Sequence, residues 1–94
     1  MTSREALVAI NPATGLTVGH YPVLDADEIG ASVTGCHRAQ KAWEIVGFEQ
    51  RAELLQRLGD QLEDQREYLA RLITGEMGKP LAQAEAEIDK CAWV

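Results

Sequence analysis

The side chains best suited to chemistry are two thiols and two imidazoles: Cys36, Cys91, His20 and His37. Zinc sites draw such ligands in close pairs, as CxxC or as two histidines four residues apart on a helix. None of the four has that spacing, and neighbours such as Cys36 and His37 diverge by about 100° on a helix. A cysteine nucleophile would need a base and an oxyanion hole, and the sequence offers neither near either thiol. We predict no metal ligand and no nucleophile here, and we expect both cysteines to be small core residues.

The segment GEMGKP at positions 75–80 has part of the pattern of a phosphate-binding loop. That loop, GxxxxGK followed by Ser or Thr, wraps backbone amides around phosphates after a strand. The first glycine would fall at Ile73 and the metal-binding hydroxyl at Pro80, and no strand is expected upstream. We interpret the segment as a turn between two helices and predict no cofactor-binding residue in it.

Two carboxylate pairs, Glu63 with Glu67 and Glu85 with Asp89, are spaced by one helical turn. Paired carboxylates can act as general acid and base. Solvated faces of amphipathic helices produce the same spacing by default. We interpret both pairs as surface charges, so that no catalytic residue is predicted in the chain.

The first part of the chain predicts a β-hairpin. Apolar and β-branched residues at 7–10 and 16–23 flank the segment NPATG at 11–15. In that segment Asn11 can bond the following backbone, Pro12 sets φ for a turn, and Gly15 can adopt positive φ. A lone hairpin is marginally stable in water, so we expect it to lie against a larger element.

After Pro22 the apolar period changes to about 3.6, which predicts helices. The first covers residues 26–45, with Asp25 and Glu28 at capping-box spacing and Gly47 at its end. A strong helical stretch follows over 48–77, with a break near Asp64 and Gln65, where an expected apolar position is polar. Gly78 is expected as its left-handed cap. Short linkers predict neighbours that pack antiparallel or obliquely.

A third helix is expected from Pro80, with Leu81, Ala84, Ile88 and Cys91 on one face. It has no stop signal before Val94, so we expect an incomplete fold: mostly α with an N-terminal β-hairpin.

Composition excludes several classes of function. The chain has 94 residues, 15 of them acidic against 9 basic, for a net charge of −6. That balance argues against nucleic-acid binding, which needs clustered Lys and Arg. No apolar run approaches the roughly 20 residues that cross a bilayer, and no secretory leader is visible. With two unpaired cysteines, a soluble cytoplasmic protein of one domain is expected.

The same positions carry a family resemblance. INPATGLTVGHYPV at 10–23, AW at 42–43, FEQRAELLQRLGDQLE at 48–63 and LARLITGEMGKPLAQAEAEIDKCAWV at 69–94 resemble the amino-terminal segment of NAD(P)-dependent aldehyde dehydrogenases. The four segments occur in the family's order and spacing. The similarity is greatest to the succinate-semialdehyde dehydrogenase branch.

The resemblance implies that residues 1–94 are the hairpin and helices that pack outside the dinucleotide-binding domain, without the Rossmann core and the catalytic domain. The complete enzyme would oxidise an aldehyde to an acid through a Cys thiohemiacetal and hydride transfer to NAD or NADP. Neither Cys36 nor Cys91 matches the family's nucleophile motif. The resemblance also implies a possible monovalent cation held by the backbone carbonyls of Ile10 and Glu76.

Two functions from different classes follow. In the first, the chain is the front part of an aldehyde dehydrogenase, inactive and binding no cofactor alone. Its partner is then the remainder of that polypeptide, and the isolated chain should expose apolar surface and self-associate. In the second, it is a freestanding, non-catalytic helical interaction module, whose signature would be a closed core.

Overall fold

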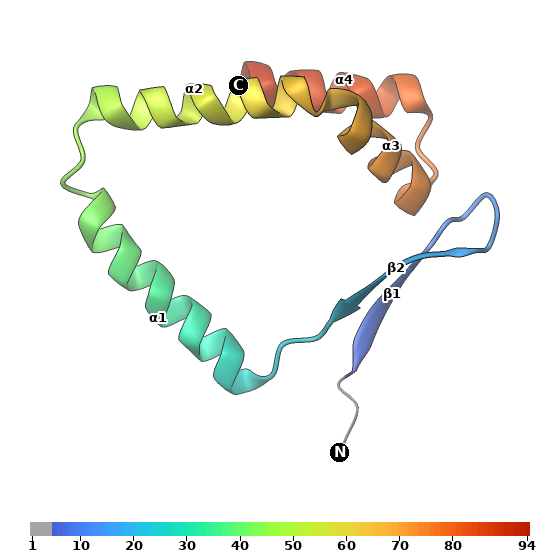
Figure 1. Cartoon of the computed structure of the whole chain (residues 1–94), viewed down its shortest axis with the longest axis horizontal. Coiled ribbons are helices and arrows are strands. Elements are labelled where there is room, and N and C mark those ends of the chain that lie inside the picture. The colour runs from blue at the N-terminus through green and yellow to red at the C-terminus, as the bar shows by residue number, and fades with distance from the viewer. Residues whose placement is uncertain (1–4) are drawn as a thin grey trace.

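The computed structural model describes residues 5–94 and confirms a mostly helical chain with an N-terminal hairpin (Figure 1). The elements are β1 (Ala6–Ile10), β2 (Thr17–Pro22), α1 (Ala26–Trp43), α2 (Phe48–Asp64), α3 (Arg66–Met77) and α4 (Leu81–Trp93).

The hairpin pairs β1 with β2 antiparallel, with Leu7 opposite Tyr21 and an irregularity after Ala9. Its turn is built as the sequence predicts. The Asn11 side chain accepts a hydrogen bond from the Ala13 amide at 2.8 Å, and Gly15 has φ of 74°. Because glycine has no Cβ, Gly15 adopts this left-handed conformation without a steric penalty, and the chain can turn back here.

Helix α1 begins as predicted and ends two residues early. The Asp25 side chain accepts from the Glu28 amide at 2.8 Å, which caps the helix start. The helix ends at Trp43, not at 45, because the Val46 amide donates to the Trp43 carbonyl at 3.0 Å and closes a turn there. Gly47 is the N-cap of α2 and does not end α1.

The predicted break at Asp64 and Gln65 separates α2 from α3. Gly78 caps α3 in the left-handed region, with φ of 76°, and its amide donates to the Thr74 carbonyl. The third predicted helix, α4, begins at Leu81, not at Pro80, because Pro80 is extended, with ψ of 138°.

A small core joins α2, α3 and α4. Among residues 5–94 the buried apolar side chains are Ala70, Ala84 and Ile88. Leu62, Leu69 and Ile73 pack against them and are partly buried. A Cβ at Gly59 of α2 would lie 3.0 Å from the Ala92 carbonyl oxygen of α4, so the glycine permits this close approach of the two helices.

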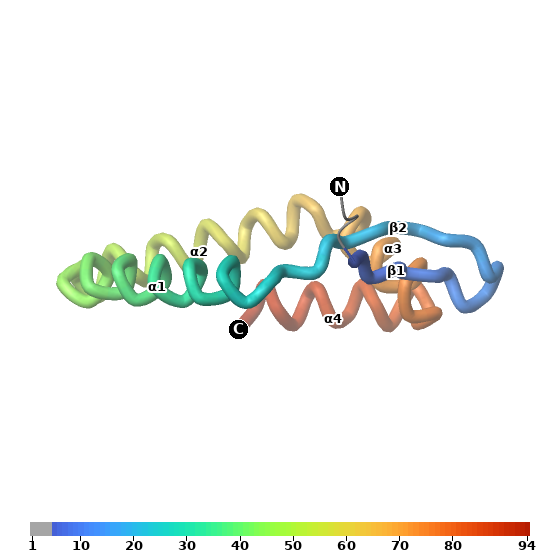
Figure 2. Tube along the Cα trace, turned by 90° about the horizontal axis from the view of Figure 1, so that it is seen from below, coloured from blue at the N-terminus to red at the C-terminus, as the bar shows by residue number. Residues whose placement is uncertain are grey.

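The chain is thin and open. Its extents are 48 × 43 × 14 Å, and its radius of gyration is 17.7 Å. A compact domain of this length has a radius of gyration of about 12 Å. Figure 2 shows the elements edge-on in a shallow layer. Within residues 5–94, no helix has both the length and the hydropathy needed to cross a bilayer.

The prediction that all the helices pack on their neighbours is wrong for α1. This helix has no buried residue and makes no extensive contact with another element of the described chain. It diverges from α2 at one end and joins β2 at the other, so it lies apart from α3 and α4 (Figure 1).

The start of α3 is tied to α4 by one arginine. Nε of Arg66 donates to Oδ1 of Asp89 at 2.6 Å, and Nη2 donates to Oδ2 at 2.9 Å. Nη1 lies 3.2 Å from a carboxylate oxygen of Glu85. The hydrogen bonds from the guanidinium lower the pKa of Asp89 below its ordinary value.

We expect Gly78→Ala to destabilise the fold by about 1–2 kcal/mol, because a Cβ is penalised at positive φ. The new Cβ would also lie 2.8 Å from Cγ of Pro12. Gly30→Ala is the matched control: nothing lies within 4 Å of a Cβ there, and alanine favours a helix interior by about 0.5–1 kcal/mol. The melting temperature, measured by circular dichroism, should fall for Gly78→Ala and rise for Gly30→Ala. Equal shifts of the same sign would contradict the role of Gly78.

We expect the Arg66 contacts to weaken in acid. The pKa of Asp89 is lowered in the folded chain, so the contact stabilises the fold above the ordinary carboxyl pKa of about 3.9. That stability is lost as the pH falls through the lowered folded value. In Arg66→Gln the pKa of Asp89 should rise toward its ordinary value, measured by carbon NMR of the carboxyl group. Arg57→Gln, which removes only the exposed pair with Glu53, should leave Asp89 unchanged. An Asp89 titration unaffected by Arg66→Gln would refute the assignment.

Candidate functional site

The four candidate metal ligands are dispersed. His20 lies on β2, Cys36 and His37 on α1, and Cys91 on α4, all of them exposed. Among residues 5–94, no three His, Cys, Asp or Glu side chains form a group that could hold a metal. The expectation that both cysteines are core residues is wrong, because no described element covers the faces that carry them.

The segment at 75–80 is a turn between α3 and α4, as predicted. Its amide at Gly78 is used in capping α3, where it donates to the Thr74 carbonyl at 2.9 Å. The Lys79 ammonium pairs with Glu87 of α4. The Gly78 amide and the Lys79 ammonium are therefore both engaged by contacts within the chain.

The carboxylate pairs are surface charges. Glu85 and Asp89 both contact the Arg66 guanidinium. The break at Gln65 places Glu63 on α2 and Glu67 on α3, and Glu67 pairs with Arg71 at 3.0 Å. Neither pair lines a described pocket, so the geometry supports no acid–base role.

The hairpin docks on the end of α3. The Tyr21 hydroxyl donates to a carboxylate oxygen of Glu76 at 2.8 Å, and this bond raises the pKa of Tyr21. Pro12 of the turn lies against Gly78. The structure thus brings together the two segments that contain Ile10 and Glu76. A shared cation between their carbonyls stays a prediction.

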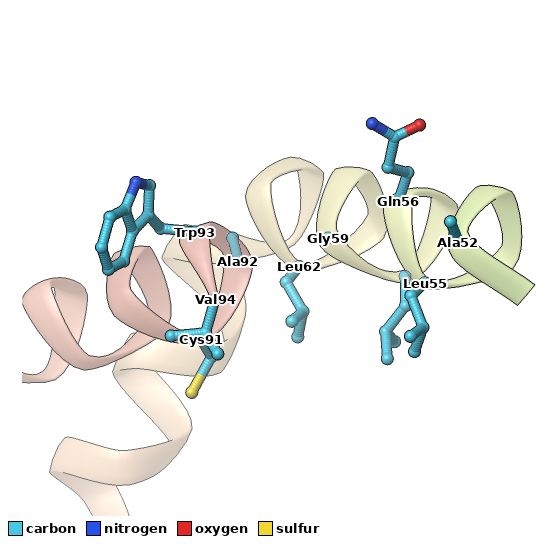
Figure 3. A pocket seen from close by; sticks show the side chains of 10 residues that line it. Ala52, Leu55, Gln56, Gly59, Leu62, Cys91, Ala92, Trp93 and Val94 are labelled. Atoms are coloured by element: carbon cyan, nitrogen blue, oxygen red, sulfur yellow. The ribbon is translucent and has the colours of Figure 1, made fainter. Parts of the chain in front are cut away.

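The main candidate for function is an uncovered apolar groove between α2 and the end of α4. Its volume is about 580 Å³, and its lining includes Leu55, Leu58, Leu62, Cys91 and Trp93. Figure 3 shows Leu55, Leu62 and Cys91 pointing to one side, whereas Trp93 points away from them. Leu58 is 54% exposed and Trp93 is 84% exposed. The lining is mainly apolar, with no convergent polar groups, so it suits protein packing more than catalysis.

A second apolar groove, of about 260 Å³, lies between β2 and α3, lined in part by Val18, Tyr68 and Leu72. On α1, Ile29 and Val33 are also exposed. Apolar surface is therefore spread over several elements of the described chain, as the first hypothesis expects. Ile88 is buried, because it lies at the contact of α4 with α3, and Leu62 and Leu69 are partly buried there.

Sequence reasoning missed the contacts that link distant segments. Sequence reasoning can identify pairs at helical spacing, such as Glu53 with Arg57 and Glu67 with Arg71, which are four residues apart and both measure 3.0 Å. It did not identify Arg66 with Asp89, which are 23 residues apart, or the reach of Arg51 back to Val46. No local pattern marks such contacts, because the folded path of the chain decides them.

Comparisons with known proteins agree with this architecture. The sequence model of the aldehyde dehydrogenase family matches residues 1–94. A 3-sulfolactaldehyde dehydrogenase of Pseudomonas putida is 43% identical over 86 residues, which are 92% of this chain and 18% of that protein. A succinate-semialdehyde dehydrogenase [NADP(+)] of Escherichia coli is 39% identical over 88 residues, 94% of this chain and 18% of that protein.

A solved structure shares the fold. The NADP-dependent glyceraldehyde-3-phosphate dehydrogenase of Bacillus halodurans, complexed with NADP, superposes with a TM-score of 0.91 at 33% identity, over 94% of this chain and 18% of that one. The chain thus spans less than a fifth of the length of the relatives that it matches. Since the family's sequence model matches its whole length, the chain belongs to the aldehyde dehydrogenase family.

Proposed function

We propose that residues 1–94 are the N-terminal segment of an NAD(P)-dependent aldehyde dehydrogenase, which oxidises an aldehyde to a carboxylic acid. The observation that carries the proposal is the family match over the whole chain, together with its 18% coverage of relatives such as the E. coli enzyme. The dinucleotide-binding and catalytic domains would then be supplied by the remainder of the polypeptide.

The segment's own role is to cover the nucleotide-binding core. A layer 14 Å thick with Leu58 about half exposed and Trp93 largely exposed has apolar faces that its own residues do not bury. Covering such faces is favourable by about 25 cal/mol per Å² of apolar surface. The partner that we propose is the rest of the same polypeptide.

The proposed substrate is succinate semialdehyde. The P. putida and E. coli relatives are named for 3-sulfolactaldehyde and succinate semialdehyde. In both compounds an anionic group is separated from the reacting aldehyde by two carbon atoms. The support for this class of substrate is the names of these relatives.

The proposed cofactor is NAD or NADP, which accepts the hydride. NADP is favoured by the name of the E. coli relative and by the B. halodurans complex. In the turn at 75–80, the Gly78 amide caps α3 and the Lys79 ammonium pairs with Glu87, so both groups are engaged within the chain. We therefore assign cofactor binding to the remainder of the enzyme.

We do not propose the freestanding helical module. That function requires a closed core, and the buried apolar residues in the described part of the chain are Ala70, Ala84 and Ile88.

We expect the 94-residue chain alone to show no production of reduced nicotinamide with succinate semialdehyde and NAD or NADP. Residues 6–93, grafted into the E. coli enzyme in place of its matching segment, should support NADP-dependent oxidation. Ile88→Asp in the graft should abolish that activity, because it buries a charge in the core. Lys90→Gln, at an exposed position of the same helix, should preserve it. Turnover by the isolated chain, or an inactive graft, would argue against the proposal.

We also expect the isolated chain to self-associate through its apolar groove. Its weight-average mass in sedimentation equilibrium should rise with concentration. Leu58→Glu should shift the mass toward that of the monomer, because it places a charge in the groove. Arg57→Ala, on the same helix and outside that groove, should not. A monomer at every concentration would contradict this expectation.

A further inference from the structure

The joint between α1 and α2 is a short elbow. Helix α1 ends at Trp43 and α2 begins at Phe48, so four residues connect two long helices. Gly47 at the elbow has open space around its Cα, with nothing within 4 Å of a Cβ built there. Steric contact at Gly47 therefore does not fix the angle between the helices.

One side chain reaches back across this elbow. Nε of Arg51, in the first turns of α2, donates to the Val46 carbonyl at 2.9 Å. Nη2 of the same guanidinium donates to the Glu44 carbonyl at 2.7 Å. The guanidinium carbon also lies 5.5 Å from the centre of the Trp43 ring, within the range of a cation–π contact.

One of these hydrogen bonds acts on the end of α1, because Glu44 is its C-cap residue, and the other acts on Val46 in the linker. The last carbonyls of a helix have no intrahelical donor and carry partial negative charge. Arg51 supplies donors and positive charge to the segment that ends α1. Its planar fork can bond two carbonyls at fixed directions, which a lysine ammonium cannot do.

The elbow angle matters because α1 is held mainly at its two ends, by the elbow and by residues 23–25, which join it to β2. None of its residues is buried, and its 18 residues form a lever about 27 Å long. A change of about 20° at the elbow would move the far end of such a lever by about 9 Å. The apolar side chains of Ile29 and Val33 would move with it.

We propose that Arg51 is a clasp that sets the angle between α1 and α2. With the clasp closed, Ile29 and Val33 are presented at a fixed place, which lowers the entropic cost of covering them. With the clasp open, α1 swings about 44–47. The proposal concerns the chain's own conformation and does not depend on the proposed enzymatic function.

The two native cysteines allow a direct test. Cys36 on α1 and Cys91 on α4 are both exposed, and α4 packs on α2. Nitroxide labels on these thiols report the position of α1 against the α2–α4 pair, measured by pulsed electron paramagnetic resonance. Labelled chain is diluted in excess unlabelled chain, so that only pairs within one molecule contribute.

We expect a single narrow distance distribution for the unaltered chain. In Arg51→Ala the distribution should widen by about twofold, because the hinge residues then adopt a range of φ and ψ. Arg51→Lys should give an intermediate width. Arg57→Ala removes an arginine of the same helix that pairs only with Glu53 in this structure, and it should leave the width unchanged.

Circular dichroism decides between a change of angle and unfolding. The helix content of Arg51→Ala should equal that of the unaltered chain. The clasp is refuted by an unchanged width in Arg51→Ala, by equal widening in Arg57→Ala, or by a broad distribution in the unaltered chain. Loss of helix content in Arg51→Ala also refutes it, because Arg51 would then support the helices themselves.

Discussion

The close contact of α4 with α2 and α3 is the interaction on which the rest of this structure depends. Ala70 and Ala84 are fully buried where α3 meets α4, and Ile88 is nearly so. Gly59 lets the backbone of α4 approach α2. Small residues permit close packing but bury little apolar area, and hydrophobic stabilisation is proportional to that area. The contact therefore fixes the arrangement of three helices, and other interactions must position the hairpin and α1.

Polar side chains also fix the geometry, both at this contact and outside it. Arg51 bonds the end of α1, Arg66 joins α3 to α4, and Tyr21 joins the hairpin to α3. Exposed ion pairs contribute little free energy, about 0–1 kcal/mol each. Such contacts can select an orientation, but they cannot replace a core. A chain built this way keeps its shape best when another surface covers its apolar faces.

The elements could be predicted from the sequence because local rules decide them. The Asn11 turn, the Asp25 cap, the break at Gln65 and the left-handed Gly78 each depend on residues within a few positions. The arrangement of α1 could not be predicted, because the length of a linker does not specify its angle. The exposure of Cys36 and Cys91 was missed for a related reason: apolar spacing shows which face is meant for burial, and it does not show whether this chain supplies the covering atoms.

The same distinction applies to the apolar face of α2. The regular leucine stripe of α2 is typical of a buried helix face, yet Leu54 and Leu58 remain about half exposed in this structure. A stripe of this kind is costly to keep on a surface unless something packs against it. Under the proposed function, these residues match the shape of a partner surface. The proposal assigns that surface to the remainder of an aldehyde dehydrogenase, the family that the chain matches, and the side chains of a packing face give no information on the choice of aldehyde.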